Sequence, residues 1–131
     1  MEELWSVPGG REVQTDQVLY NLTRRGSESD LLPWLRERRI PVMAYSPIEQ
    51  ARLLRDPKLA AFAKRYGMTP AQVALAWLLK DDDVIVIPKS SRPEKLKENL
   101  GALALRLNDV QLAELDRLFP PPTGPRPLEM L

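Results

Sequence analysis

The sequence predicts an α/β protein with a parallel sheet, because three short apolar runs alternate with segments of helical periodicity. The runs cover residues 13–20, 40–45 and 83–88. The second is typical of strands buried in parallel sheets, and the third is almost wholly β-branched. Right-handed crossovers through the intervening helices would join these strands. At 131 residues the chain fits a single domain, 1–131, with a modest core.

Six helical segments are predicted from caps, stop signals and apolar spacing. In chain order they are residues 1–5, 27–39, 56–66, 69–80, 91–103 and 108–119. The fourth has the clearest start, since Thr69, Pro70 and Gln72 match a capping box with Pro at the first helical position. The tail after the last helix begins with three prolines and is expected to be irregular.

The fifth helix carries two faces of interest. Ser91 and Glu94 predict a second capping box at its start. Its expected buried face holds three leucines at helical spacing: Leu96, Leu100 and Leu103. Another face brings together three polar residues: Lys95, Glu98 and Asn99.

Charge and composition exclude several classes of protein. Nineteen basic and eighteen acidic residues give no net field to recruit nucleic acid or an anionic membrane. No run of about 18 apolar residues predicts a membrane span, and no leader is expected. The lack of Cys excludes disulfides and fits a cytoplasmic location. The lack of His removes the commonest metal ligand and general base, and no carboxylate spacing suggests a metal site.

Polar residues follow the second and third predicted strands, at the end of a parallel sheet where ligands bind. These residues are Tyr45-Ser46 and Lys89-Ser90. A Tyr offers a flat face for a heterocyclic ring, and a Lys with hydroxyls beside a helix N-terminus suits a phosphate. Taken alone, the Lys-Ser pair is equally an ordinary turn with capping residues and a solvated Lys.

The joint pattern is more specific than either pair. Three motifs occur in order at crossover spacing: Gln17-Val18-Leu19-Tyr20-Asn21-Leu22, Ala44-Tyr45-Ser46-Pro47-Ile48, and Ile87-Pro88-Lys89-Ser90 followed by Glu98-Asn99. In these motifs the chain resembles the bacterial aldo-keto reductases, in their C-terminal portion only. The resemblance implies a partial (β/α)8 TIM barrel, with the last three parallel βα units plus the C-terminal helix.

The resemblance also implies NADP(H) as cofactor and a role for each matching residue. Gln17 would bond the nicotinamide carboxamide, and Tyr45 would stack on the nicotinamide ring. Ser46 and Ile48 would line the path of the pyrophosphate. The residues expected at the adenosine end are Lys89, Ser90, Arg92 and Lys95 for the 2′-phosphate, and Glu98 and Asn99 for the adenine.

The resemblance leaves the catalytic residues without a counterpart. The family's chemistry uses an Asp, a Tyr acid, a Lys and a His, all placed before the segment that this chain resembles. Tyr20, Tyr45 and Tyr66 are the only tyrosines, and none has the sequence context of the acid. We therefore expect no catalytic residue, and whether the chain is an enzyme stays open. The expected function is a truncated aldo-keto reductase-like protein that binds NADP(H) weakly and is not catalytic alone.

Two alternatives involve other chains. In the first, the protein would be one part of a split or complemented NADPH-dependent carbonyl reductase. In the second, it would be an oligomer with a repurposed pocket. An open three-stranded sheet would leave two unpaired edges and one uncovered face. Some of the strand valines are expected on that face: Val18, Val42, Val84 and Val86. The expected partner is therefore a second copy, in a homo-oligomer, or a complementing N-terminal half.

Overall fold

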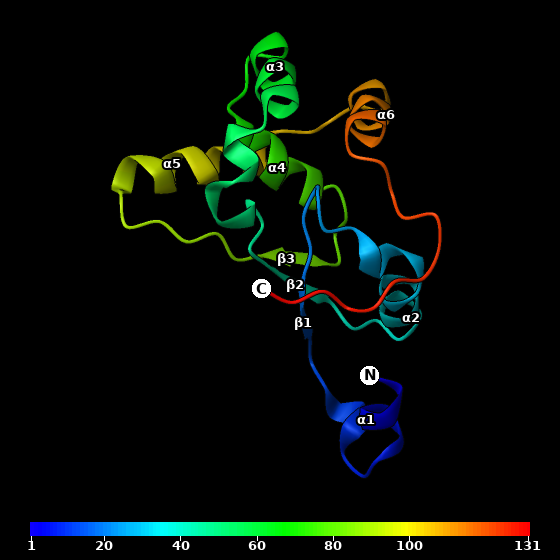
Figure 1. Cartoon of the computed structure of the whole chain (residues 1–131). Helices are drawn as coiled ribbons and strands as arrows, with labels where there is room; N and C mark the ends of the chain where they lie inside the picture. Colours follow the sequence, from blue (N-terminus) through cyan, green and yellow to red (C-terminus); the bar gives the residue numbers. More distant parts are fainter.

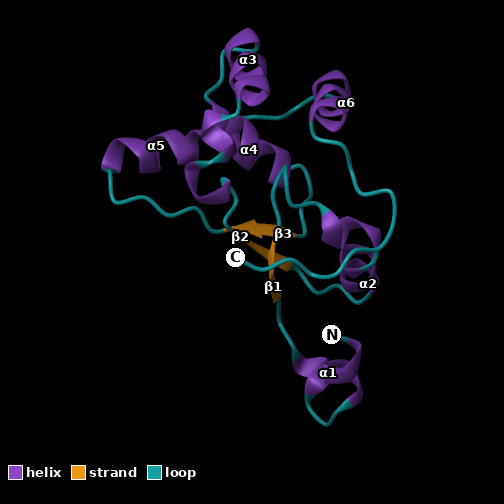
Figure 2. Cartoon of the chain, in the orientation of Figure 1, coloured by secondary structure: helices purple, strands orange, loops and turns teal.

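The computed structural model describes residues 1–131 and contains one parallel sheet in the order β1-β2-β3 (Figure 2). The strands are β1 (Asp16–Leu19), β2 (Val42–Tyr45) and β3 (Val84–Val86). Gln17 is in register with Met43, and Met43 with Ile85. The predicted parallel sheet is confirmed, and each strand is shorter than the apolar run that predicted it.

Helices separate the strands in the predicted order α1-β1-α2-β2-α3-α4-β3-α5-α6. Their bounds are α1 (Glu2–Ser6), α2 (Leu31–Glu37), α3 (Pro57–Arg65), α4 (Pro70–Leu78), α5 (Pro93–Gly101) and α6 (Asp109–Leu118). In Figure 1, α1 lies at one end of the molecule and α3 and α6 lie at the other. After α6 the tail returns past α2 toward the sheet without regular structure (Figure 1).

Two helices begin with reciprocal capping boxes, which satisfy backbone groups that would otherwise lack partners. The Thr69 hydroxyl accepts from the Gln72 amide at 3.2 Å, and the Gln72 side chain accepts from the Thr69 amide at 3.1 Å. Asn108 and Gln111 make the same exchange at the start of α6, at 2.9 Å each. The predicted Thr69 box is confirmed.

The box predicted at Ser91 is wrong. The helix begins at Pro93, so Arg92 occupies the capping position and its side chain makes no cap. The hydroxyl of Ser90 accepts from the Arg92 amide at 3.2 Å instead, which closes the turn before the helix. Ser91 is exposed and does not cap the helix.

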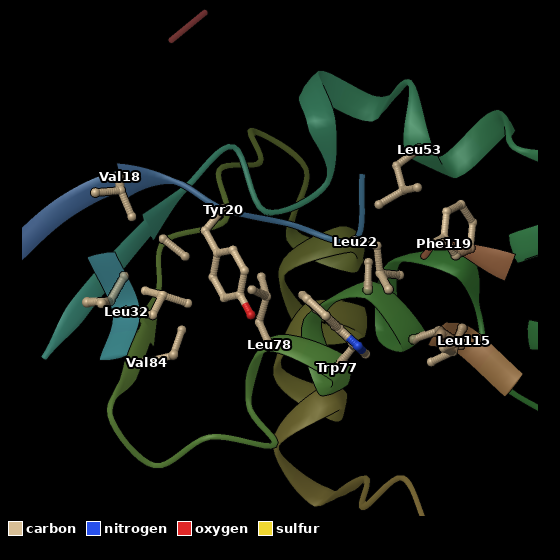
Figure 3. Close-up of a cluster of buried hydrophobic side chains, with 14 of the residues drawn as sticks. Val18, Tyr20, Leu22, Leu32, Leu53, Trp77, Leu78, Val84, Leu115 and Phe119 are labelled. Atoms are coloured by element: carbon tan, nitrogen blue, oxygen red, sulfur yellow. The ribbon is translucent and has the colours of Figure 1, made fainter. Parts of the chain in front are cut away.

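The core lies between the helices and one face of the sheet, with Trp77 of α4 near its centre (Figure 3). The Tyr20 and Trp77 rings meet at 5.4 Å between centroids. In Figure 3, strand residues such as Val18 lie on one side of this pair, and Leu115 and Phe119 lie on the other. One continuous cluster therefore connects the sheet to the last helix.

The strand valines do not face the uncovered side of the sheet. Val18, Val42 and Val84 are buried in the core, and Val86 packs against it. The cause is the phase of the strands, since alternate residues point to opposite faces. The opposite face, called the inner face below, therefore carries the residues between them: Gln17, Met43 and Ile85, followed along the strands by Tyr45 and by Leu19, which is buried.

The leucines expected on the buried face of the fifth helix are also not buried; two lie on α5, and Leu103 lies in the short 3-10 turn that follows it. Leu96, Leu100 and Leu103 are 44%, 64% and 58% exposed. They line a groove of about 380 Å³, called the α5 groove, together with Leu75, Leu79, Val86, Pro88 and Asn99. The helix lies beside β3, at the end of the sheet, and α4 covers only one of its flanks. Helical spacing identified the shared face correctly, but nothing in these 131 residues covers it.

Val84 and Ile85 provide a direct test of the two faces, because they are neighbours on β3. Val84→Asp should lower the free energy of unfolding by about 3 kcal/mol or more, since it buries an unpaired charge. Ile85→Asp should change it by less than about 1 kcal/mol, since Ile85 is 43% exposed. Urea denaturation followed by circular dichroism measures both. Equal losses in the two variants would contradict the assignment of the faces.

Candidate functional site

The candidate site lies at the carboxyl ends of the three strands, which all lie on the same side of the sheet because the strands are parallel. Three chain segments leave this edge. They are residues 20–25 after β1, residues 46–51 after β2 and residues 87–92 after β3. Of the predicted site residues, Gln17 lies within β1 and Tyr45 is the last residue of β2. All the others lie on the second segment, on the third segment or on α5.

Gln17 and Tyr45 lie on the inner face. Gln17 is in register with Met43, so Tyr45 is two residues closer to the strand ends, or about 7 Å at the usual rise. The Gln17 side chain is exposed and Tyr45 is half-buried. Neither side chain makes a hydrogen bond within the protein, so an amide and a phenol ring face the uncovered side without internal partners.

The loop at residues 46–51 follows an unusual backbone path. Four of its non-glycine residues have left-handed φ angles: Ser46 at 50°, Glu49 at 49°, Gln50 at 52° and Ala51 at 67°. Each such residue costs about 1–2 kcal/mol relative to a right-handed conformation. Ser46 and Ile48, the residues predicted to line a pyrophosphate, lie on this loop and are half-buried.

An ion pair between half-buried Arg24 and buried Glu49 connects this loop to the segment after β1. Arg24 donates from Nε and Nη2 to Oε1 of Glu49, at 3.0 and 2.9 Å. Asn21 donates from Nδ2 to Oε2 of Glu49 at 2.8 Å and to the Ser46 carbonyl at 2.9 Å. Burial alone would raise the pKa of Glu49, but the bonds from Arg24 and Asn21 lower it overall. We call Asn21, Arg24 and Glu49 the Glu49 cluster.

Sequence reasoning missed the Glu49 cluster. Asn21 belongs to the motif that runs from Gln17 to Leu22, but no function was assigned to it from the sequence. Arg24 and Glu49 are 25 residues apart, and neither spacing nor periodicity relates them. The one available signal was an acidic residue, Glu49, directly after the apolar run that ends in Pro47-Ile48.

Cations gather at the turn between β3 and α5. Lys89 is exposed and has no hydrogen-bond or ion-pair partner. Arg92 approaches Glu94 at 3.8 Å, but both side chains are about two-thirds exposed, so the pair is weak. Ser90 is held within the turn by its bond to the Arg92 amide. Two cations are therefore available to an external anion.

Lys95 is less available than predicted. It donates to the Glu98 carboxylate, and this bond is the main cause that lowers the pKa of Glu98, followed by a bond from Thr69. Gln72 of α4 also donates to the Glu98 carbonyl at 3.3 Å. The structure thus brings Lys95 and Glu98 together but pairs them with each other. Asn99 lies beside them and lines the α5 groove.

The other tyrosines are engaged in packing. Tyr20 is buried and donates to Glu28 at 2.8 Å, and its pKa is raised by burial and by the Glu28 charge. Tyr66 donates to Glu114 at 3.1 Å. No group of three or more metal-ligating side chains comes together in the structure. None of its helices is long and apolar enough to cross a bilayer.

Comparison with known proteins gives a consistent match. Residues 2–119 match the model of the Aldo/keto reductase family. The chain is 41% identical to the methylglyoxal reductase YeaE of Escherichia coli over 136 residues, which cover 100% of this chain and 48% of that protein. It is 30% identical to an aldo-keto reductase of Mycobacterium avium over 118 residues, with 90% and 38% covered.

Solved structures agree with this match. An aldo-keto reductase from Klebsiella pneumoniae, crystallised in complex with NADPH, has a TM-score of 0.95 and 41% identity, with 99% of this chain and 48% of that chain covered. A second structure, a 2,5-diketo-D-gluconic acid reductase B, has a TM-score of 0.72 and 30% identity, with 86% and 42% covered. The chain spans about half the length of these relatives, or less.

Proposed function

The chain belongs to the aldo/keto reductase family, and on that premise we propose that it is the NADP(H)-binding part of a carbonyl reductase. One observation carries this proposal above the others. After β3, Lys89 has no partner and Arg92 has only a weak, exposed pair with Glu94, while Gln17 and Tyr45 face the open side of the same sheet without internal partners. The Klebsiella pneumoniae structure of the same fold, crystallised with NADPH, supports a dinucleotide at this edge.

The proposed cofactor spans the sheet from β1 to α5. Gln17 donates to or accepts from the nicotinamide carboxamide, and Tyr45 stacks on its ring. Ser46 and Ile48 line the pyrophosphate. The adenosine end meets the α5 side: Lys89, Ser90, Arg92 and Lys95 at the 2′-phosphate, and Glu98 and Asn99 at the adenine. Binding is weak, because the inner face is open to solvent and no second surface encloses the nicotinamide.

We propose that these 131 residues do not catalyse reduction alone. Carbonyl reduction needs a hydride, which the cofactor supplies, and a proton donor near the nicotinamide. The chain has no His, and Tyr20 and Tyr66 are bonded to Glu28 and Glu114 away from the inner face. Tyr45 is assigned to stacking. A proton donor must therefore come from outside this set of residues.

The missing surface is proposed to come from a complementing N-terminal half rather than from a second copy. The relatives are about twice as long as the chain, so a second half of similar size completes them. The two ends of the sheet also differ. Beside β3 lies the apolar α5 groove. Beside β1 lies a hollow of about 500 Å³ with a mixed lining: the charged residues Glu2, Asp16, Asp30 and Arg126, and the apolar residues Met1, Leu31, Trp34 and Leu128.

This difference bears on self-assembly. A ring made from two copies would place the β3 end of one copy against the β1 end of the other. The leucines would then meet three carboxylates among the apolar side chains of the hollow, and those carboxylates would lose hydration without a compensating partner. A different polypeptide can present an apolar helix to the α5 groove. The alternative in which the chain forms an oligomer with a repurposed pocket is therefore the less favoured one.

NADPH should bind at least about tenfold more tightly than NADH, because Lys89 and Arg92 would contact the 2′-phosphate. Lys89→Ala should weaken NADPH binding about tenfold and leave NADH binding unchanged, since one charge-assisted contact is lost. Titration calorimetry measures both. Lys97→Ala is the matched control, because Lys97 is exposed on α5 two residues from Lys95. Equal affinity for both cofactors would contradict the assignment.

Reduction of methylglyoxal by NADPH should be undetectable with the purified chain, since no proton donor faces the proposed nicotinamide. Activity should appear on co-expression with the part of the Escherichia coli methylglyoxal reductase YeaE that this chain does not match. Loss of absorbance at 340 nm measures turnover. A turnover of about 1–10³ s⁻¹ from the chain alone would contradict the proposal.

Docking in the α5 groove can be tested in the same co-expression. Leu100→Asp should abolish the complex and the activity, because it places a charge in the apolar groove. Val110→Asp is the matched control, since Val110 is 69% exposed on α6 and Leu100 is 64% exposed. Co-purification through a tag on the complementing half measures the complex. Equal losses in both variants, or in neither, would argue against the groove.

A further inference from the structure

Residues 46–51 cannot keep their backbone path by local preference. Four of the five non-glycine residues with positive φ in the whole chain lie in this loop. None of the four is Gly or Asn, the residues that adopt this region most readily. The loop's own bonds are short-range: Glu49 N to Ser46 O, Ala51 N to Ile48 O and Arg52 N to Glu49 O. A conformation of this kind persists only when surrounding contacts determine it.

The contacts that determine it come from the segment after β1. Glu49 is the only acidic residue of the chain that is buried, and its two carboxylate oxygens are divided between two donors. Arg24 takes Oε1 and Asn21 takes Oε2. Asn21 is fully buried, and its own carbonyl oxygen accepts from the amides of Thr23 and Arg24, so its amide nitrogen is held in place.

The same amide reaches the candidate site directly. Asn21 Nδ2 donates to the carbonyl of Ser46, the first residue of the loop and the residue that follows Tyr45. The Glu49 cluster therefore holds the loop at two points, at its first residue, Ser46, and at Glu49. A change in the cluster would alter the direction of the Ser46 and Ile48 backbone without touching the β3–α5 turn.

We propose that Asn21, Arg24 and Glu49 are positioning residues for the dinucleotide, and that they act by fixing the 46–51 loop. This inference rests on the proposed function, and it adds three residues that contact no part of the proposed cofactor themselves. The cluster acts on the pyrophosphate and nicotinamide side of the site. The adenosine 2′-phosphate side, formed by Lys89 and Arg92, is independent of it.

The C-terminal tail also reaches the cluster. Glu129 accepts from Nη1 of Arg24 at 2.7 Å, but Glu129 and Arg24 side chains are both 35% exposed at this contact. The pair with Glu49 uses a carboxylate that is 7% exposed, where screening by water is much weaker. The positioning role therefore belongs to the Arg24–Glu49 pair, and the tail contact adds little to it.

Binding of two different ligands distinguishes a positioning role of the cluster from a general effect on stability. Glu49→Gln and Arg24→Met should each weaken NADPH binding about tenfold, because the loop no longer presents Ser46 and Ile48 in one conformation. Binding of adenosine 2′,5′-bisphosphate, which lacks the nicotinamide half, should stay within about twofold of the wild type. Titration calorimetry measures both ligands. Equal weakening of both ligands, or of neither, would overturn the proposal.

Two control variants remove other ion pairs. Glu129→Gln removes only the tail contact of Arg24, and Arg36→Met removes a surface pair with Asp81 and Asp83. Both should bind NADPH as the wild type does. A tenfold loss in Arg36→Met would show that any destabilisation weakens binding, and it would overturn the role of the cluster.

Hydrogen exchange tests the loop without a ligand. In Glu49→Gln and Arg24→Met, the amides of Glu49, Ala51 and Arg52 should exchange at least about tenfold faster, because their bonds depend on the loop path. Amides of α4 should be unchanged. If the wild type binds no NADPH, the proposed function fails, and this measurement still decides the proposal. Unchanged exchange in both variants would overturn the inference.

Discussion

Arg25 is buried beneath the junction of three parts of the chain, and their relative positions depend on it. Its guanidinium lies over the Trp77 ring at 4.9 Å, and it donates to Glu28, Asp116 and the Phe119 carbonyl. A buried guanidinium is tolerated only when its donors are satisfied, so α4, the turn before α2 and the end of α6 must approach it together. The neighbouring Arg24 turns the other way, to Glu49. Two adjacent arginines thus join the core and the strand ends through one segment.

The sheet is packed on one face and largely open on the other. The helix face of the sheet is packed around Trp77, while the inner face and the α5 groove hold exposed apolar residues such as Ile85 and Leu100. Burial of apolar surface stabilises by roughly 25 cal/mol per Å². Each uncovered leucine is therefore a source of binding energy for a partner, and a cost in solubility without one. The proposed cofactor site and the α5 groove are open for the same reason, because both lie on surfaces that the proposed second half would enclose.

Local signals in the sequence predicted the strands, the element order and the Thr69 cap, because each depends on residues close together in the chain. Which face of an element is covered is different. Helical spacing placed Leu96 and Leu100 on one face, but burial needs a second surface that spacing cannot supply. The sequence did not show which face of the sheet the valines occupy. A strand made of β-branched residues lacks the alternation of polar and apolar residues that would indicate its buried face. The Glu49 cluster joins residues 25 positions apart and has no local signature.

The candidate site was predicted as a set of residues, and the structure adds the charges that surround them. Lys95 and Glu98 neutralise each other, so a dinucleotide phosphate meets Lys89 and Arg92 first. The Lys95–Glu98 pair also limits repulsion among three cations on one turn while the site is empty. A ligand that recruits Lys95 must displace the Glu98 carboxylate, and the bond from Thr69 to that carboxylate opposes the movement. In the proposed site, discrimination for a 2′-phosphate would therefore depend on Lys89 and Arg92 of the turn more than on the helix.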